Sequence, residues 1–196
     1  MKVISIILGL AVAFAIWIFV SHMNNVPKLD ESVKSAWSQV ENQYKRRADL
    51  IPNLVSTVKG YAKHETELFT EVTKARSSVG KITITPEMLN NPNAFKAYEK
   101  AQSSLGGALS KLLAVSERYP DLKSDKNFLT LQSQLEGTEN RISVARRDYI
   151  SSVKKYNIEL RTIPGKYVAS FLYPEAGIKP TFSITKEDKA LPRVEF

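Results

Sequence analysis

The sequence has no cysteine and only two histidines among its 196 residues, and these shortages exclude several kinds of chemistry. Without cysteine the chain forms neither disulfides nor a thiolate metal site. His22 and His64 alone do not make a histidine-rich metal site within one chain. No glycine-rich phosphate loop follows a strand, and no Ser, His and Asp grouping is placed for nucleophilic catalysis. We therefore expect a protein that is not an enzyme, with no catalytic, cofactor-binding or metal-ligating residues.

Charge is missing from residues 3–20, which read VISIILGLAVAFAIWIFV. Eighteen such residues are near the lower limit for crossing a bilayer of roughly 30 Å. A cleaved signal peptide is the alternative, but residues 18–22 do not offer the small side chains that its cleavage site needs. We expect residues 1–22 to be an uncleaved transmembrane anchor that contacts the lipid bilayer through residues 3–20. Positive charges flank it almost equally, yet the short N-terminus with Lys2 favours a body outside the cytoplasm.

The formal net charge of +8 is unevenly distributed. Residues 141–196 carry eleven Lys and Arg against six Asp and Glu, whereas residues 81–139 carry seven of each. This excess has two interpretations: a solvated helix face, or attraction to an acidic surface such as anionic lipid headgroups or a polyanion. Lys45-Arg46-Arg47 and Arg146-Arg147 could touch phosphates, but acidic residues interleave closely with them. We expect no nucleic-acid partner.

Residues 33–79 show apolar side chains at steps of three and four, the spacing of one helix face. Trp37 lies on this stripe, so we expect it in a core or an interface. Pro52 lacks an N–H and its ring clashes with the carbonyl of Ala48, which predicts a kink at residues 48–52 in one long helix. At about 1.5 Å per residue that helix would measure roughly 70 Å, longer than its partners, which favours homo-oligomer formation.

Two further long helices are predicted, at residues 93–119 and at about 125–161, with Ser124 or Asp125 capping the second. A short helix is predicted at residues 166–173, followed by a mostly irregular tail with spaced aromatics that docks on the bundle or on a neighbouring subunit. The predicted fold is all-α: an anchor at residues 1–22, an antiparallel bundle of long helices at 23–163, and a C-terminal docking segment at 164–196.

Several motifs together resemble the LemA family of bacterial membrane-anchored proteins. They are AWSQV at residues 36–40, RRADLIPNLV at 46–55, TVKGYA at 57–62, LLAVSERYPDL at 112–122, LEGTENRI at 135–142 and ARRDY at 145–149. The family often has Phe-Pro where this chain has Ile163-Pro164, a change that conserves the chemistry. The resemblance implies one N-terminal membrane helix, an antiparallel bundle, a single-pass location in the bacterial inner membrane and no defined reaction. It also implies relatives tied to building or shaping bacterial internal membranes.

Two groups of acidic residues could suggest a metal site, and each has a simpler structural interpretation. His64 and Glu65 lie in HETEL, which lacks the second histidine of the HExxH zinc motif. Glu136 and Glu139 are one helical turn apart beside Asn140 and Arg141, so they could hold a metal on a bundle wall. A buried or half-buried polar cluster that sets helix register is the stronger interpretation. Its expected members beside these glutamates are Arg46, Arg47, Asp49 or Asn53.

Three functional hypotheses follow. The first is a non-enzymatic scaffold that self-assembles or organises other envelope proteins. The second is an adaptor or regulator of a membrane enzyme such as a protease. The third, an enzyme or metal-binding protein, would use Glu136, Glu139 and His64.

Overall fold

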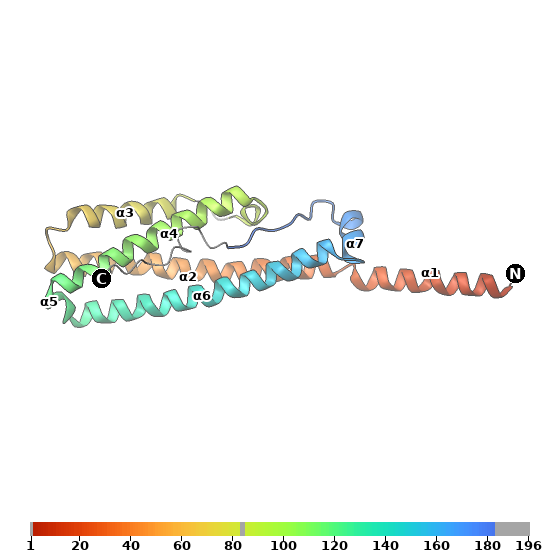
Figure 1. Cartoon of the computed structure of the whole chain (residues 1–196), viewed down its shortest axis with the longest axis horizontal. Coiled ribbons are helices and arrows are strands. Elements are labelled where there is room, and N and C mark those ends of the chain that lie inside the picture. The colour runs from red at the N-terminus through yellow and green to blue at the C-terminus, as the bar shows by residue number, and fades with distance from the viewer. Residues whose placement is uncertain (1, 83–84, 183–196) are drawn as a thin grey trace, which may run out of the picture.

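The computed structural model describes residues 2–82 and 85–182, and every regular element in these ranges is helical. The all-α prediction is confirmed. The elements are α1 Lys2–His22, α2 Asn25–Tyr61, α3 Thr66–Gly80, the 3₁₀ turn η1 Pro86–Asn90, α4 Pro92–Ala114, the 3₁₀ turn η2 Val115–Arg118, α5 Pro120–Lys123, α6 Lys126–Arg161 and α7 Gly165–Leu172. Together they form an elongated bundle with α1 projecting from one end (Figure 1).

Helix α1 projects beyond the bundle, and its large apolar side chains are exposed along its whole length. Only residues 23 and 24 separate it from α2, so the two helices run nearly in line (Figure 1). Among the described residues it is the one helix whose length and composition suit a bilayer crossing. It makes no part of the buried core.

Helices α2 and α6 form the antiparallel backbone of the bundle and match in length at 37 and 36 residues. Hydrogen bonds mark both ends of the pair. At the α1 end, Asn25 Nδ2 donates to Glu159 Oε1 at 3.3 Å, and at the far end the Tyr61 hydroxyl donates to Asp125 Oδ2 at 3.0 Å. Each helix therefore covers the apolar stripe of the other over its full length.

The prediction of one helix over residues 33–79 is wrong, because the chain leaves the helical conformation at residues 62–65. Helix α2 passes through Pro52 and ends at Tyr61, one residue after Gly60. The chain turns at residues 62–65, and α3 folds back along the bundle to pack on α4. Folding back brings Phe69 and Val72 into the same apolar cluster as Ile51. The excess length that favoured a homo-oligomer is therefore absent.

Arg76 explains why α2 continues through Pro52. Proline has no N–H, so the carbonyl of Ala48 lacks its donor within the helix. Arg76 Nε on α3 donates to this carbonyl oxygen at 3.1 Å. The hydrogen bond that the proline removes is thus replaced by one from the neighbouring helix.

The predicted helix starts are confirmed by side-chain caps. Asn91 Oδ1 accepts from the backbone N–H groups of Asn93 and Ala94 at the start of α4. Asp125 Oδ1 accepts from Phe128 N at 2.8 Å at the start of α6. At its other end, α4 finishes at Ala114, short of the predicted residue 119, and continues as η2 and α5.

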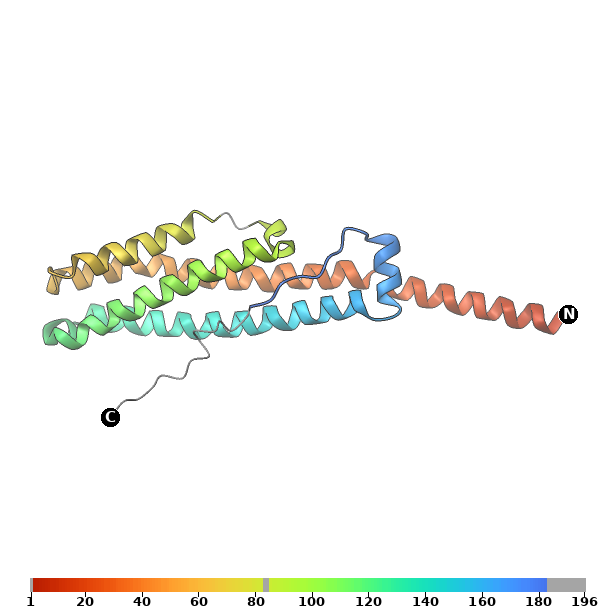
Figure 2. The ribbon, with the colours of Figure 1, turned by 45° about the horizontal axis from the view of Figure 1, so that its top comes forward.

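The core of the bundle is surrounded by different elements in its two halves. At the end far from α1, helices α2, α3, α4 and α6 surround one apolar cluster. Nearer α1, residues 173–182 run as a strap along α2 and α6 and meet the start of α4, where Phe182 packs against Phe95 (Figure 2). The predicted short helix is observed as α7, and residues 173–182 contact the bundle, for example where the Tyr149 hydroxyl donates to the Pro180 oxygen at 3.1 Å. The remainder of the tail, including Phe196, lies outside the described residues.

An aromatic cluster joins the strap to the helices. Trp37 is 4% exposed, as expected for a core residue. Its ring contacts those of Phe95, Tyr98, Tyr149 and Phe182 at centroid distances of 5.3–6.2 Å. Such contacts between rings stabilise a core beyond the apolar area that they bury. Phe182 therefore secures the strap to the centre of the molecule.

Candidate functional site

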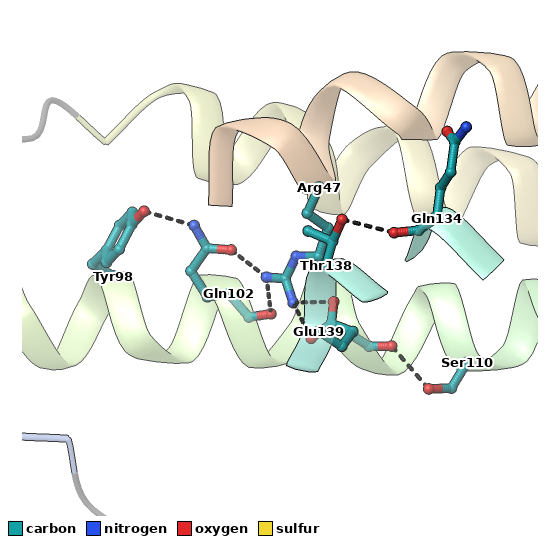
Figure 3. Close-up of polar contacts among 8 residues, drawn as sticks. Arg47, Tyr98, Gln102, Ser110, Gln134, Thr138 and Glu139 are labelled. Atoms are coloured by element: carbon teal, nitrogen blue, oxygen red, sulfur yellow. Dashed lines mark hydrogen bonds and ion pairs between the residues drawn. The ribbon is translucent and has the colours of Figure 1, made fainter. Parts of the chain in front are cut away.

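A polar cluster lies in the middle of the bundle and centres on Arg47 of α2, which is 4% exposed (Figure 3). Its Nη1 donates to Glu139 Oε1 of α6 at 3.0 Å. Its Nη2 donates to the backbone oxygen of Gln102 on α4 at 3.2 Å and to the Gln102 side-chain oxygen. Gln102 Nε2 in turn donates to the Tyr98 hydroxyl at 2.7 Å. The cluster therefore links three helices through one guanidinium.

One side of this cluster is buried, whereas the other side reaches the protein surface. Burial raises the pKa of both Tyr98 and Tyr44, and the Arg47 guanidinium lies 5.0 Å from the Tyr44 ring centroid. Glu139, by contrast, is half-exposed and reaches the buried cation from the surface. A buried cation whose hydrogen bonds are supplied by fixed partners sets the register of the helices around it.

The structure brings together only part of the predicted cluster. Arg47 and Glu139 pair, but Glu136 is exposed and accepts from Gln132 Nε2 at 3.0 Å. The remaining predicted members are also exposed: Arg46, Asp49, Asn53, Asn140 and Arg141. Gln102 was missed, although it occupies the one polar position in the apolar stripe of α4 between Tyr98 and Leu105, which could have revealed it.

The residues of the enzyme hypothesis lie apart. His64 is exposed in the turn between α2 and α3, at the end of the bundle marked by the Tyr61–Asp125 hydrogen bond. Glu139 lies fourteen residues beyond Asp125 along α6, about 20 Å away at the helical rise. Within residues 2–82 and 85–182, no three His, Asp or Glu side chains gather as a metal site would require.

A second polar cluster holds the strap and centres on Lys179, which is 4% exposed. Its Nζ lies 2.8 Å from Asp30 Oδ1 of α2 and donates to Asn90 Oδ1 of η1 at 2.8 Å. The ammonium also lies 5.0 Å from the Tyr156 ring centroid. Asn157 exchanges two hydrogen bonds with the Lys179 backbone, one of them from Lys179 N to Asn157 Oδ1 at 3.0 Å.

Asp30 at this cluster is held ionised. Burial opposes its charge, but hydrogen bonds from Lys179 and Lys34 outweigh it and hold the pKa of Asp30 below its usual value. A cavity of about 350 Å³ opens beside these residues, between the start of α2 and the strap. It is lined by Pro27, Asn90, Tyr173 and Glu175 among others. Three charged groups at its wall, Asp30, Lys34 and Lys179, already pair with each other.

Part of the C-terminal positive charge is internal to the fold. Lys179 is buried, and the Arg146 guanidinium lies 4.2 Å from the Phe182 ring centroid and 3.7 Å from Glu99. Arg47, from the first basic run, is also buried. These cations act in packing, so they do not contribute to a continuous basic surface.

The Arg47 cluster and Lys179 lie within a region that matches a known family, whereas Asp30, the partner of Lys179, precedes it. The LemA family matches residues 36–196, which include α2 from Ala36, all later helices and the strap. The chain belongs to the LemA family. The predicted resemblance is therefore confirmed.

The chain is similar to magnetosome MamQ proteins and to a protein LemA. The chain is 28% identical over 162 residues to the magnetosome proteins MamQ 1 and MamQ 2 of Paramagnetospirillum magneticum, covering 74% of this chain and 60% of each relative. It is 24% identical over 163 residues to protein LemA of Metamycoplasma hominis, covering 83% of this chain and 70% of that protein. The chain thus spans about three-fifths of the length of the MamQ proteins that it matches.

The LemA match assigns no chemistry to the two clusters. It covers the Arg47 cluster and Lys179, whereas α1 precedes it. Each polar cluster bridges elements that are distant in sequence, and each is saturated largely by protein groups. The clusters therefore act as interhelical ties within this LemA protein.

Proposed function

We propose that this LemA protein is a non-enzymatic, membrane-anchored scaffold that assembles with itself or organises other envelope proteins. The observation that carries the proposal is the alignment of α1 with α2 (Figure 1). If α1 crosses the bilayer, the long α2–α6 pair stands away from the membrane and presents its sides to neighbours. The interhelical ties at Arg47 and Lys179 give such a rod a defined shape.

The outer side of α6 is the proposed contact surface. It exposes four aliphatic side chains: Leu129, Val144, Ile150 and Ile158. At about 100° per residue these fall within roughly a third of the helix circumference. Copies held in one membrane plane meet at raised effective concentration, so weak contacts between such faces suffice for assembly.

Crosslinking in native membranes tests this surface. The double variant Val144→Glu with Ile158→Glu should reduce crosslinked oligomers, whereas Ser103→Glu on the exposed side of α4 should not. Equal crosslinking of both variants would contradict the assignment of the contact surface to α6. A monomer throughout would contradict self-assembly.

Affinity isolation from membranes separates the scaffold from the alternative, an adaptor that regulates a membrane enzyme such as a protease. Recovery of the protein with copies of itself supports the scaffold. A stoichiometric enzyme partner supports the adaptor. Full function in cells after alanine replacement of His64, Glu136 and Glu139 would remove the enzyme hypothesis.

We further propose that the bundle lies outside the cytoplasm of a bacterial cell whose inner membrane holds α1. A reporter active only in the periplasm, fused after Phe196, should then be active. Activity of a cytoplasm-only reporter at the same position would reverse the assignment.

A further inference from the structure

Helix α7, Gly165–Leu172, lies where α1 meets the bundle. Its buried side consists of Gly165, Val168 and Ala169, which pack toward the neighbouring helices. Its outer side carries Tyr167, 61% exposed, and Phe171, 78% exposed. The larger apolar side chains of α7 therefore face away from the bundle, opposite to the arrangement of a helix that packs only on its own core.

Three contacts fix α7 at the level of the C-terminal end of α1. The Phe171 and Phe19 rings meet edge-on at 6.4 Å between centroids. The Tyr173 hydroxyl, one residue beyond α7, donates to the backbone oxygen of Met23 at 2.9 Å. At the other end of α7, a Cβ on Gly165 would collide with the carbonyl oxygen of Glu159, so the helix start sits directly against α6.

The orientation of α7 differs from that of every long helix. Figure 2 shows it lying across the common axis of α1, α2 and α6. If α1 crosses a bilayer, a helix that lies across α1 at its end lies in the plane of the bilayer surface. Aromatic side chains favour that interface, and Trp17 of α1 lies near the same level.

We propose that α7 is an interfacial helix whose outer side, Tyr167 and Phe171 with Ile163 beside them, inserts into the headgroup region of the bilayer that α1 crosses. Ile163 is 74% exposed and precedes the helix by two residues. Lys166 and Arg161 are exposed nearby, within reach of lipid phosphates. The inference goes beyond the scaffold proposal, because it concerns how the bundle is held relative to the membrane. Contact at a second point, beside α1, fixes the height and tilt of the bundle.

Site-specific labelling tests this placement, since the chain has no cysteine to remove. The full-length variants Tyr167→Cys and Phe171→Cys would carry an environment-sensitive nitrobenzoxadiazole label, in vesicles of phosphatidylcholine and phosphatidylglycerol. Ser103→Cys on α4 is the control, because Ser103 is exposed, away from α7 and outside the proposed contact surface on α6. Val12→Cys reports separately on whether α1 lies in the bilayer.

Labels at residues 167 and 171 should lose most of their fluorescence to lipids with a nitroxide near the headgroup, and should be shielded several-fold from iodide relative to the label at 103. Quenching at residue 12 alone, with the labels at 167 and 171 as open to iodide as the label at 103, would overturn the inference while leaving the anchor intact. Shielding that disappears when protein is diluted with excess lipid would also overturn it, because a second copy would then be the covering surface.

Discussion

At the residue scale, the features that distinguish this protein are polar side chains placed inside a helical bundle. Arg47 and Lys179 are both buried, and each reaches a carboxylate on a different element. Removing one partner of such a pair leaves the other charge without compensation, which costs more than the pair itself contributes. The two clusters therefore make the arrangement of the helices specific, while the apolar stripes supply the driving force for folding.

Glu139→Gln should lower the free energy of unfolding by about 1–3 kcal/mol, because the buried Arg47 guanidinium loses its anionic partner. Glu136→Gln is the matched control, one turn away, exposed and bonded to Gln132. Its effect should stay within about 0.5 kcal/mol. Chemical denaturation of the two variants in the same detergent measures both values, and equal effects would contradict a special role for Glu139.

Trp37→Ala should lower the free energy of unfolding by roughly 3–5 kcal/mol, because the indole fills the space among four other rings. Denaturation followed by circular dichroism measures the change. A loss below about 1 kcal/mol would mean that the aromatic cluster collapses around the gap.

At the element scale, interactions between helices decide where α2 ends. Pro52 and Gly60 both weaken this helix in isolation. Helix α2 continues through Pro52, where Arg76 supplies the missing donor, and ends just after Gly60. Local propensity identified both weak points, but the position of α3 determined which of them breaks.

A double-mutant cycle tests the compensation at Pro52. Arg76→Ala should destabilise the natural protein by about 1 kcal/mol, through loss of its bond to the Ala48 carbonyl. In a Pro52→Ala background the helix regains its own N–H donor, so Arg76→Ala should then have little effect. Additive effects of the two substitutions on thermal unfolding would contradict this account.

The strap should respond to acid through Asp30. Hydrogen bonds from Lys179 and Lys34 hold the pKa of Asp30 below its usual value, so its ionised form contributes stability above that usual value and loses it as the pH falls through the lower pKa of the folded state. Acidification below about pH 4 should therefore release the strap, measured as faster proteolysis of the C-terminal segment. Asp30→Asn should weaken the strap already at neutral pH and flatten this response, whereas Asp49→Asn, exposed on the same helix, should not.

At the scale of the whole molecule, the protein is a rod with a membrane-compatible helix at one end. Helix α1 contributes nothing to either apolar cluster, while α2 through the strap form a closed set of contacts. The pairing of α2 with α6 over their full length explains how two helices hold a shape this elongated. The strap completes the core in the half nearer α1, together with the start of α4 (Figure 2).

A fragment of residues 23–196 should fold without α1. We expect helical circular dichroism and a cooperative thermal transition close to that of the full-length protein, because the buried core is retained. The fragment should also bind vesicles weakly through α7. Loss of the cooperative transition would mean that α1 supports the bundle directly.

A fragment that ends at Pro180 is the complementary case, and here the structure changes the expectation. From the sequence, the tail could dock either on the bundle or on a neighbouring subunit, and in the second case its removal would spare the helices. Phe182 packs against Trp37 and Phe95 inside the core, so this deletion should destabilise the bundle.

The sequence by itself determined the helical class, the apolar helix at residues 3–20, a cap at Ser124 or Asp125, and the place of Trp37 on an apolar stripe. These features depend on periodicity and on chemistry within one or two turns, which any single segment carries. Only the tertiary structure decided the turn at residues 62–65, the pairing of Arg47 with Gln102, the burial of Lys179 and the crosswise position of α7. Each of these depends on groups tens of residues apart, and their free energies are set by which partner lies opposite once the helices have packed.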